Sequence, residues 1–294
     1  MTIAEMREYA DRTLKYFLQT MPDVPFGEDD IVFDFAPPNR MFTRYKALCA
    51  EYRPSEIILK EHEEQLANNI SGQAIIGEGK SAVLINTKQQ ILKANLRYII
   101  FHELMHIYCA KTEVDGEHFI DKYGGNVPYE SDEALRDGYY ISSEFIADYY
   151  ADRYTRDGQF SFDSVRDDIS QCLYKDITAG GQDNRRDFEW ACLRLLTVFD
   201  MESVINRIIE PDVILSGNSS YAQNARRLFN ECVQLLYKQI QTEKPWKVNE
   251  DFIAELGENY LSFETVNTLY RCEQLGGIEK AKQILSNKSQ AGNT

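Results

Sequence analysis

Histidine is scarce in this chain, which has only 4 copies of it and 2 tryptophans among 294 residues. An excess of basic residues is also lacking, since 32 Lys and Arg stand against 47 Asp and Glu, for a net charge of −15. This balance argues against a general binder of nucleic acids or of anionic membranes, because both attract basic surfaces. We therefore expect neither a nucleic-acid partner nor a membrane partner.

Paired cysteines, long apolar runs and a targeting segment are missing as well. The six cysteines are widely spaced and none forms a CxxC pair, so we expect them to be small buried side chains. No run of about 18 apolar residues occurs, and the N-terminus shows no basic region followed by an apolar one. These absences predict a soluble, reduced, cytoplasmic protein.

The chain nevertheless has the material for a sizeable core, because 43% of its residues are hydrophobic and 12% are aromatic. Strand patterns are confined to the part before residue 90, and helical periodicity alone follows Gly158. The elements expected in the first part are strands at 30–36, 56–61 and 81–86 and helices at 3–19 and 41–52. The pattern predicts an α+β portion, residues 1–157, followed by an all-α portion, residues 158–294.

A long helix is predicted directly after the third strand. The capping box Thr87-Lys88-Gln89-Gln90 opens it, and it covers residues 88–111. Residues 113–142 then lack clear periodicity, which is typical of lids and binding loops. A pair of serines next caps a further helix, residues 144–154.

Two of the four histidines lie in the middle of the long helix, within the segment YIIFHELMHIY (98–108). Positions i and i+4 share a helix face, so His102 and His106 can present their imidazoles to one point. Neutral imidazole nitrogens bind Zn²⁺, and Glu103, one step round the helix, can reach water bound to such an ion. The alternative is two core or solvated histidines beside a surface glutamate. The apolar flanks favour the metal, because a buried His-Glu-His without one would leave polar groups unpaired.

A catalytic zinc site needs a third protein ligand. The best candidate is Glu144, which opens the segment EFIADYYA, with Asp148 four residues later on the same face. Asp148 can accept the free ring N–H of a ligating histidine. The rival ligand is His118 in the predicted loop. The plainer alternatives are a helix-terminal carboxylate at Glu144, favoured by the helix dipole, and a solvated acid at Asp148.

Several of these segments together resemble the ImmA/IrrE family of metallopeptidases. The shared features are the strand SAVLIN ending in Asn, Arg97 five residues before His102, HELMH, and EFIADYYA, which is similar to the family's E-x-x-A-D-x-F-A helix with Tyr150 at the aromatic position. The resemblance implies a zincin-like catalytic domain, with a small mixed sheet and an active-site helix, ahead of the helical C-terminal region. It also implies a gluzincin-type endopeptidase in which Glu144 is the third zinc ligand and Asp148 supports the ligands.

The predicted function is zinc-dependent hydrolysis of a peptide bond in a protein or peptide, with a regulatory protein as one candidate substrate. Glu103 is the general base that activates zinc-bound water and then protonates the leaving amine. Strand SAVLIN is either an edge that pairs with an extended peptide or an interior strand. The candidates for a donor to the oxyanion are Tyr108, His118, Tyr139, Tyr140 and Arg153.

The alternative function is a zinc-binding or degenerate zincin-fold interaction or regulatory protein that acts through its helical C-terminal region. In that case the metal is structural, or lost, and the helices after residue 158 are the working part. The intact Glu103 argues against a purely structural metal, because such a site has no use for a base.

Overall fold

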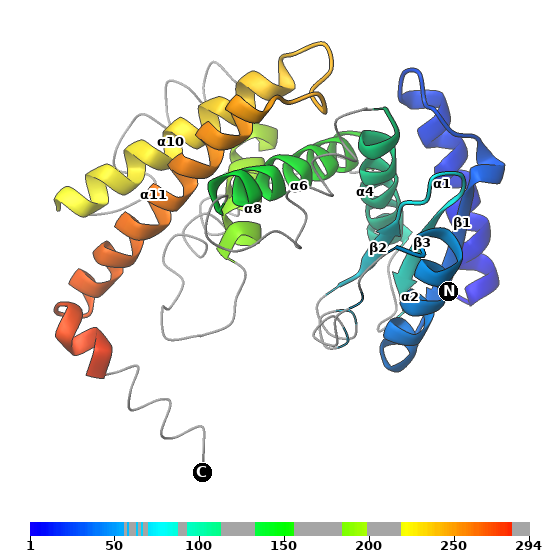
Figure 1. Cartoon of the computed structure of the whole chain (residues 1–294), viewed down its shortest axis with the longest axis horizontal. Helices are drawn as coiled ribbons and strands as arrows, with labels where there is room; N and C mark the ends of the chain where they lie inside the picture. Colours follow the sequence, from blue (N-terminus) through cyan, green and yellow to red (C-terminus); the bar gives the residue numbers. More distant parts are fainter. Residues whose placement is uncertain are drawn as a thin grey trace. The chain divides into compact units, whose positions relative to one another are not determined.

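The computed structural model describes residues 1–55, 58, 63, 66, 70–87, 93–112, 133–155, 184–198 and 219–283 (Figure 1). The chain divides into two compact units. The first consists of Met1–Ile120 and Ala147–Gly158, and the second of Asp121–Ile146 and Gln159–Thr294. Helix α6 (Glu133–Thr155) continues from one unit into the other without a break. The predicted domain boundary at residue 157 stays a prediction.

The first unit contains a three-stranded mixed sheet with the strand order β1-β3-β2. The strands are β1 (Ile31–Ala36), β2 (Gly72–Ile75) and β3 (Ser81–Asn86). β1 is parallel and β2 antiparallel to β3, with Phe33 and Ala74 on either side of Val83. SAVLIN is therefore the interior strand, and its interpretation as an edge was wrong, because it pairs with a strand on each side. Both of its neighbours are edge strands of the described sheet, and one of them, β2, was not predicted from the sequence.

Both faces of β3 are covered, and every residue of this strand is buried. The cluster on one face joins β3 to α2 (Pro38–Tyr52) and contains Met41, Tyr45, Leu48, Ala82 and Leu84. Ile85 points to the opposite face, because strand side chains alternate. Gly72 pairs with Ile85 and lies against Ile99 of α4 (Lys93–Thr112), so α4 covers this second face.

The β2–β3 hairpin is fixed to its surroundings at both ends. Asn86, the last residue of β3, donates from Nδ2 to the carbonyl oxygens of Leu66 and Ile70, each at 3.0 Å. At the turn, Lys111 of α4 donates from Nζ to the carbonyl oxygens of Gly77 (3.0 Å) and Gly79 (2.7 Å). The edge strand is therefore anchored to the helix that carries the two histidines.

Helix α1 (Ile3–Thr20) begins with a capping box in which Thr2 and Glu5 exchange hydrogen bonds. It packs against α4, where the rings of Phe17 and Phe101 lie 4.8 Å apart between centroids. The guanidinium of Arg97 lies over the Tyr16 ring at 4.4 Å. These contacts cover one side of α4 with α1.

The second unit contains the first half of α6 together with α8 (Asn184–Val198), α10 (Ser220–Ile240) and α11 (Glu250–Gln274). Its core includes an aromatic cluster of Phe188, Phe229, Tyr260 and Phe263. Helices α6 and α11 cross closely, since a Cβ atom at Gly138 or Gly257 would overlap the backbone of the other helix. Within the described residues, no helix is long and apolar enough to cross a membrane.

The architecture is α+β, with a small mixed sheet and mostly helices, as the sequence predicts. The predicted loop at 113–142 was wrong over residues 133–142, which form the first half of α6. Gly138 lies within this helix, where it allows the close crossing with α11 and does not end the helix. Residues 113–132, the predicted helix start at 88–92 and the predicted strand at 56–61, apart from residue 58, lie outside the described residues.

Candidate metal centre

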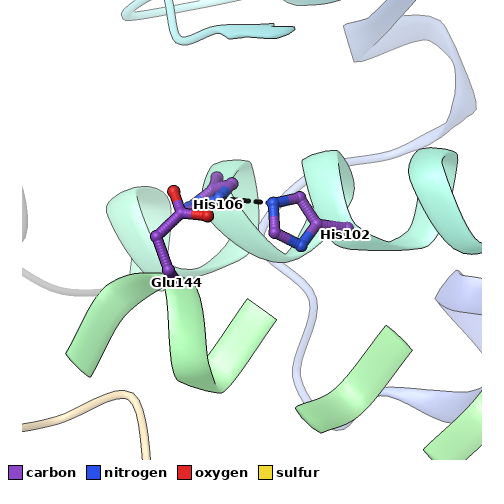
Figure 2. Close-up of side chains that lie close together, drawn as sticks. All are labelled: His102, His106 and Glu144. Atoms are coloured by element: carbon purple, nitrogen blue, oxygen red, sulfur yellow. Dashed lines mark hydrogen bonds between the residues drawn. The ribbon is translucent and has the colours of Figure 1, made fainter. Parts of the chain in front are cut away.

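Helix α4 places its two histidines inside the first unit, because the helix is apolar around most of its circumference. Ile100, Leu104 and Met105 of this helix are fully buried, and His102 itself is 8% exposed. The Nε2 atoms of His102 and His106 lie 3.0 Å apart (Figure 2). The spacing of one helical turn therefore brings both imidazole nitrogens to one point, as the sequence predicts.

A buried carboxylate orients the first of these imidazoles. Nδ1 of His102 lies 2.6 Å from Oδ1 of Asp148, which is on α6 and has no exposed surface. The hydroxyl of Tyr98 donates to the same oxygen at 2.6 Å. When Nδ1 carries the ring proton and donates to Asp148, Nε2 of His102 keeps its lone pair for a metal. Asp148 thus lies where the sequence predicts it.

Glu144 precedes Asp148 by one turn of α6, so the two carboxylates lie on one face of that helix. Ligand atoms of His102, His106 and Glu144 all lie within 4.8 Å of one another. Figure 2 shows the Glu144 carboxylate beside His106, with the two imidazoles on the neighbouring helix. These three side chains form a candidate metal-binding triad.

The donor set fits a divalent ion of the zinc type. Two nitrogens bound at about 2.0–2.1 Å with tetrahedral angles would lie about 3.3 Å apart, close to the 3.0 Å between the two Nε2 atoms. If His102 donates from Nδ1, its neutral Nε2 has no proton to offer His106, and a cation can accept both lone pairs. The half-buried Glu144 then adds an oxygen ligand and a negative charge.

Glu103 lies beside this triad and not within it. It follows His102 by about 100° round the helix, and it is 6% exposed. Its carboxylate is directed towards the edge strand, since a Cβ atom at Gly72 would lie 2.8 Å from Oε1 of Glu103. The absence of a side chain at Gly72 makes room for this acid.

Two of the suggested oxyanion donors lie on other helix faces. The ring of Tyr108 is buried and its hydroxyl donates to the Pro22 carbonyl at 2.8 Å, because Tyr108 is about 200° round α4 from His106. Burial raises the pKa of Tyr108. Arg153 is exposed, with its guanidinium 5.7 Å from the Tyr154 ring centroid. It is about 180° round α6 from Glu144, so neither residue has its side chain on the face of the ligands.

The other suggested donors are Tyr139, Tyr140 and His118. Tyr140 precedes Glu144 by one turn and therefore shares its face of α6, while the guanidinium of Arg185 lies over its ring at 4.6 Å. Tyr139 is half-buried in the same helix and lies on a different face. His118, also the rival third ligand, lies outside the described residues.

Sequence reasoning missed two residues that contact the centre. Tyr98 is one turn before His102, so the four-residue spacing that identified the histidines also identifies it. Arg186 on α8 donates to Glu144, and no local pattern connects two residues so far apart in sequence. Comparison of the chain with protein-family models, with curated proteins and with solved structures gave no match.

Proposed function

We propose that this chain is a zinc-dependent metallopeptidase of the gluzincin type. The proposal is carried by one observation, the convergence of His102, His106 and Glu144 beside a separate acid, Glu103. Two imidazoles and one carboxylate are a donor set of catalytic zinc sites, which leave the fourth position for water or substrate. Zinc suits this mixed nitrogen and oxygen set better than magnesium or calcium, which prefer oxygen ligands alone.

The residues around the triad have different roles in the proposed reaction. When bound, Zn²⁺ supplies Lewis acidity, which polarises a carbonyl group and lowers the pKa of water. Glu103 takes the proton of the attacking water and passes it to the leaving amine. Asp148 holds the imidazole of His102 in one orientation and one tautomer. Tyr140, on the face of Glu144, is the remaining described candidate for a donor to the oxyanion.

Strand β2 supports an extended peptide as the substrate. Among the described strands it lies at the edge of the sheet, and its Gly72 lies against Glu103. A peptide added to this edge would run past the carboxylate that acts as the base. The small mixed sheet next to the HELMH helix likewise supports a zincin-like arrangement of the first unit. Backbone hydrogen bonds to β2 would thus hold the protein or peptide substrate beside the base, Glu103.

The substitution Glu103→Gln tests this function, because it removes the base and keeps the shape of the side chain. We expect the purified variant to bind zinc as wild type does and to lose cleavage of a peptide library, measured by mass spectrometry. His106→Ala is the matched variant, and it should lose both zinc and cleavage. A Glu103→Gln variant that cleaves at the wild-type rate contradicts the assignment of the base.

The wild-type result separates the two functions considered from the sequence. Zinc binding with cleavage of library peptides supports the peptidase. Stoichiometric zinc without cleavage of any peptide or unfolded protein would instead favour a binding protein that acts through its helices. Metal content measured by elemental analysis, before and after dialysis, decides whether the triad holds an ion at all.

A further inference from the structure

The Glu144 carboxylate is held by an arginine that is itself fixed by a buried acid. Nη1 of Arg186 on α8 donates to Oε2 of Glu144 at 2.5 Å and to Oε2 of Glu189 at 3.1 Å. Glu189 has no exposed surface, whereas the side chains of Glu144 and Arg186 are 21% and 35% exposed. One guanidinium nitrogen therefore bridges a candidate metal ligand and a carboxylate of the core.

The position of Arg186 is determined by its own helix. Glu189 and Trp190 follow it by three and four residues, so all three share one face of α8. The guanidinium carbon lies 5.6 Å from the Trp190 ring centroid. A buried carboxylate is costly unless it is paired, so Glu189 retains Arg186 where a solvated arginine would move freely. The donor that reaches Glu144 is thus preorganised.

We propose that Arg186 is a positioning residue that holds Glu144 as a metal ligand and so raises the affinity of the site for its ion. The inference rests on the proposed zinc site. Groups that hydrogen-bond to a ligating carboxylate fix its orientation, and their loss typically lowers metal affinity or activity about 10- to 100-fold. Glu189 balances the charge of Arg186, so the pair leaves the negative charge of Glu144 in place for the cation.

The opposite role, in which Arg186 weakens metal binding, predicts the opposite change in zinc affinity when Arg186 is removed. If Arg186 competed with the ion for Glu144, its removal would free the carboxylate and tighten binding. The proposed role requires the reverse, because a carboxylate without its partner must give up rotational freedom when it binds the ion. The direction of the change in zinc affinity therefore separates the two roles.

The experiment measures the zinc affinity of the full chain by competition with a chromophoric chelator. We expect Arg186→Ala to bind zinc about 10- to 100-fold more weakly than wild type, and Arg186→Lys to recover part of the loss. The matched control is Arg185→Ala, which removes the neighbouring arginine from another buried acid, Asp137, at 3.1 Å. This control should keep the wild-type zinc affinity.

A second variant distinguishes a loss of zinc affinity from misfolding. It is needed because Arg186→Ala leaves Glu189 buried without this arginine. The double variant Arg186→Ala/Glu189→Gln removes that charge, and its melting temperature without metal should lie near that of wild type. It should still bind zinc more weakly. Affinity equal to or tighter than wild type in this variant overturns the role of Arg186.

Zinc affinities of wild type and His106→Ala distinguish a failure of the proposed zinc site from a failure of the role of Arg186. If wild type binds zinc no better than His106→Ala, the metal centre and the role of Arg186 both fall. If wild type binds zinc tightly, His106→Ala does not, and Arg186→Ala matches the Arg185→Ala control, the centre stands and only the positioning role is wrong.

Discussion

Substitution of Gly72 by alanine tests whether Glu103 acts as a base separate from the ligands. A Cβ atom at this position would lie 2.8 Å from Oε1 and 2.9 Å from Cγ of Glu103, and 2.7 Å from Cγ2 of Ile99. These contacts are all to side chains, so the backbone of β2 need not be displaced. The three atoms nearest to the added methyl group belong to the proposed base and to Ile99, and none belongs to a candidate ligand.

The size of the effect follows from these distances. Ordinary contacts of a Cβ atom begin at 3.4 Å, so the two side chains must retreat by about 0.6–0.7 Å. Ile99 is β-branched and stiff at χ1, so the more flexible Glu103 should take most of the movement. Overpacking of this kind costs about 1–3 kcal/mol of stability. Misplacement of a catalytic group by about 1 Å costs up to about 100-fold in rate, so we expect a large fall in kcat.

The assay compares kcat and KM for a cleaved peptide with zinc affinity and melting temperature. Gly79→Ala is the matched control, since it places the same methyl group in the same hairpin with no neighbour within 4 Å. We expect Gly72→Ala to lose kcat and keep zinc, and Gly79→Ala to keep both. Wild-type kcat in Gly72→Ala, or loss of zinc together with activity, would refute the separation of base from ligands.

Three further predictions concern the supports of the site and the fold. Tyr98→Phe removes a donor to the buried Asp148 and should weaken zinc binding about 10-fold; unchanged affinity would show that Asp148 orients His102 without help from Tyr98. Gly257→Ala puts a methyl group into the Ala134 carbonyl and should lower the melting temperature by several degrees, whereas Gly27→Ala, with its nearest atom at 3.8 Å, should not. Chelation should destabilise the zinc-loaded wild type by about 2.7 kcal/mol, relative to free zinc at 100 times its Kd, and leave His106→Ala unaffected.

The sequence could predict that the candidate ligands group together, because one geometric rule governs each pair of side chains. The four-residue spacing of His102 and His106, and that of Glu144 and Asp148, each define a helix face without knowledge of the tertiary fold. The strand SAVLIN was equally clear, since four of its six residues are apolar and two of these, Val83 and Ile85, are β-branched. The position of this strand inside the sheet could not be predicted, because its pairing partners come from distant segments of the sequence.

The missed features all depend on tertiary contacts. Strand β2 has only four residues and begins with Gly72, whose value lies in the space that it leaves for Glu103. Gly138 has the local character of a helix breaker and is instead a contact point between two helices. Arg186 binds a carboxylate 42 residues away, and ion pairs of this kind leave no periodic pattern.

Helices α4 and α6 use one spacing for different chemistry, and burial explains the difference. On α4, His102 and His106 point the same type of nitrogen at the same place. On α6, Asp148 is fully buried and receives the hydroxyl of Tyr98 and the ring nitrogen of His102, so its charge is used to hold an imidazole. Glu144, one turn earlier and 21% exposed, has a carboxylate oxygen within 4.8 Å of an imidazole nitrogen of each histidine. The buried acid of α6 thus orients a histidine, and the more exposed acid is the candidate ligand, although both come from the same face of one helix.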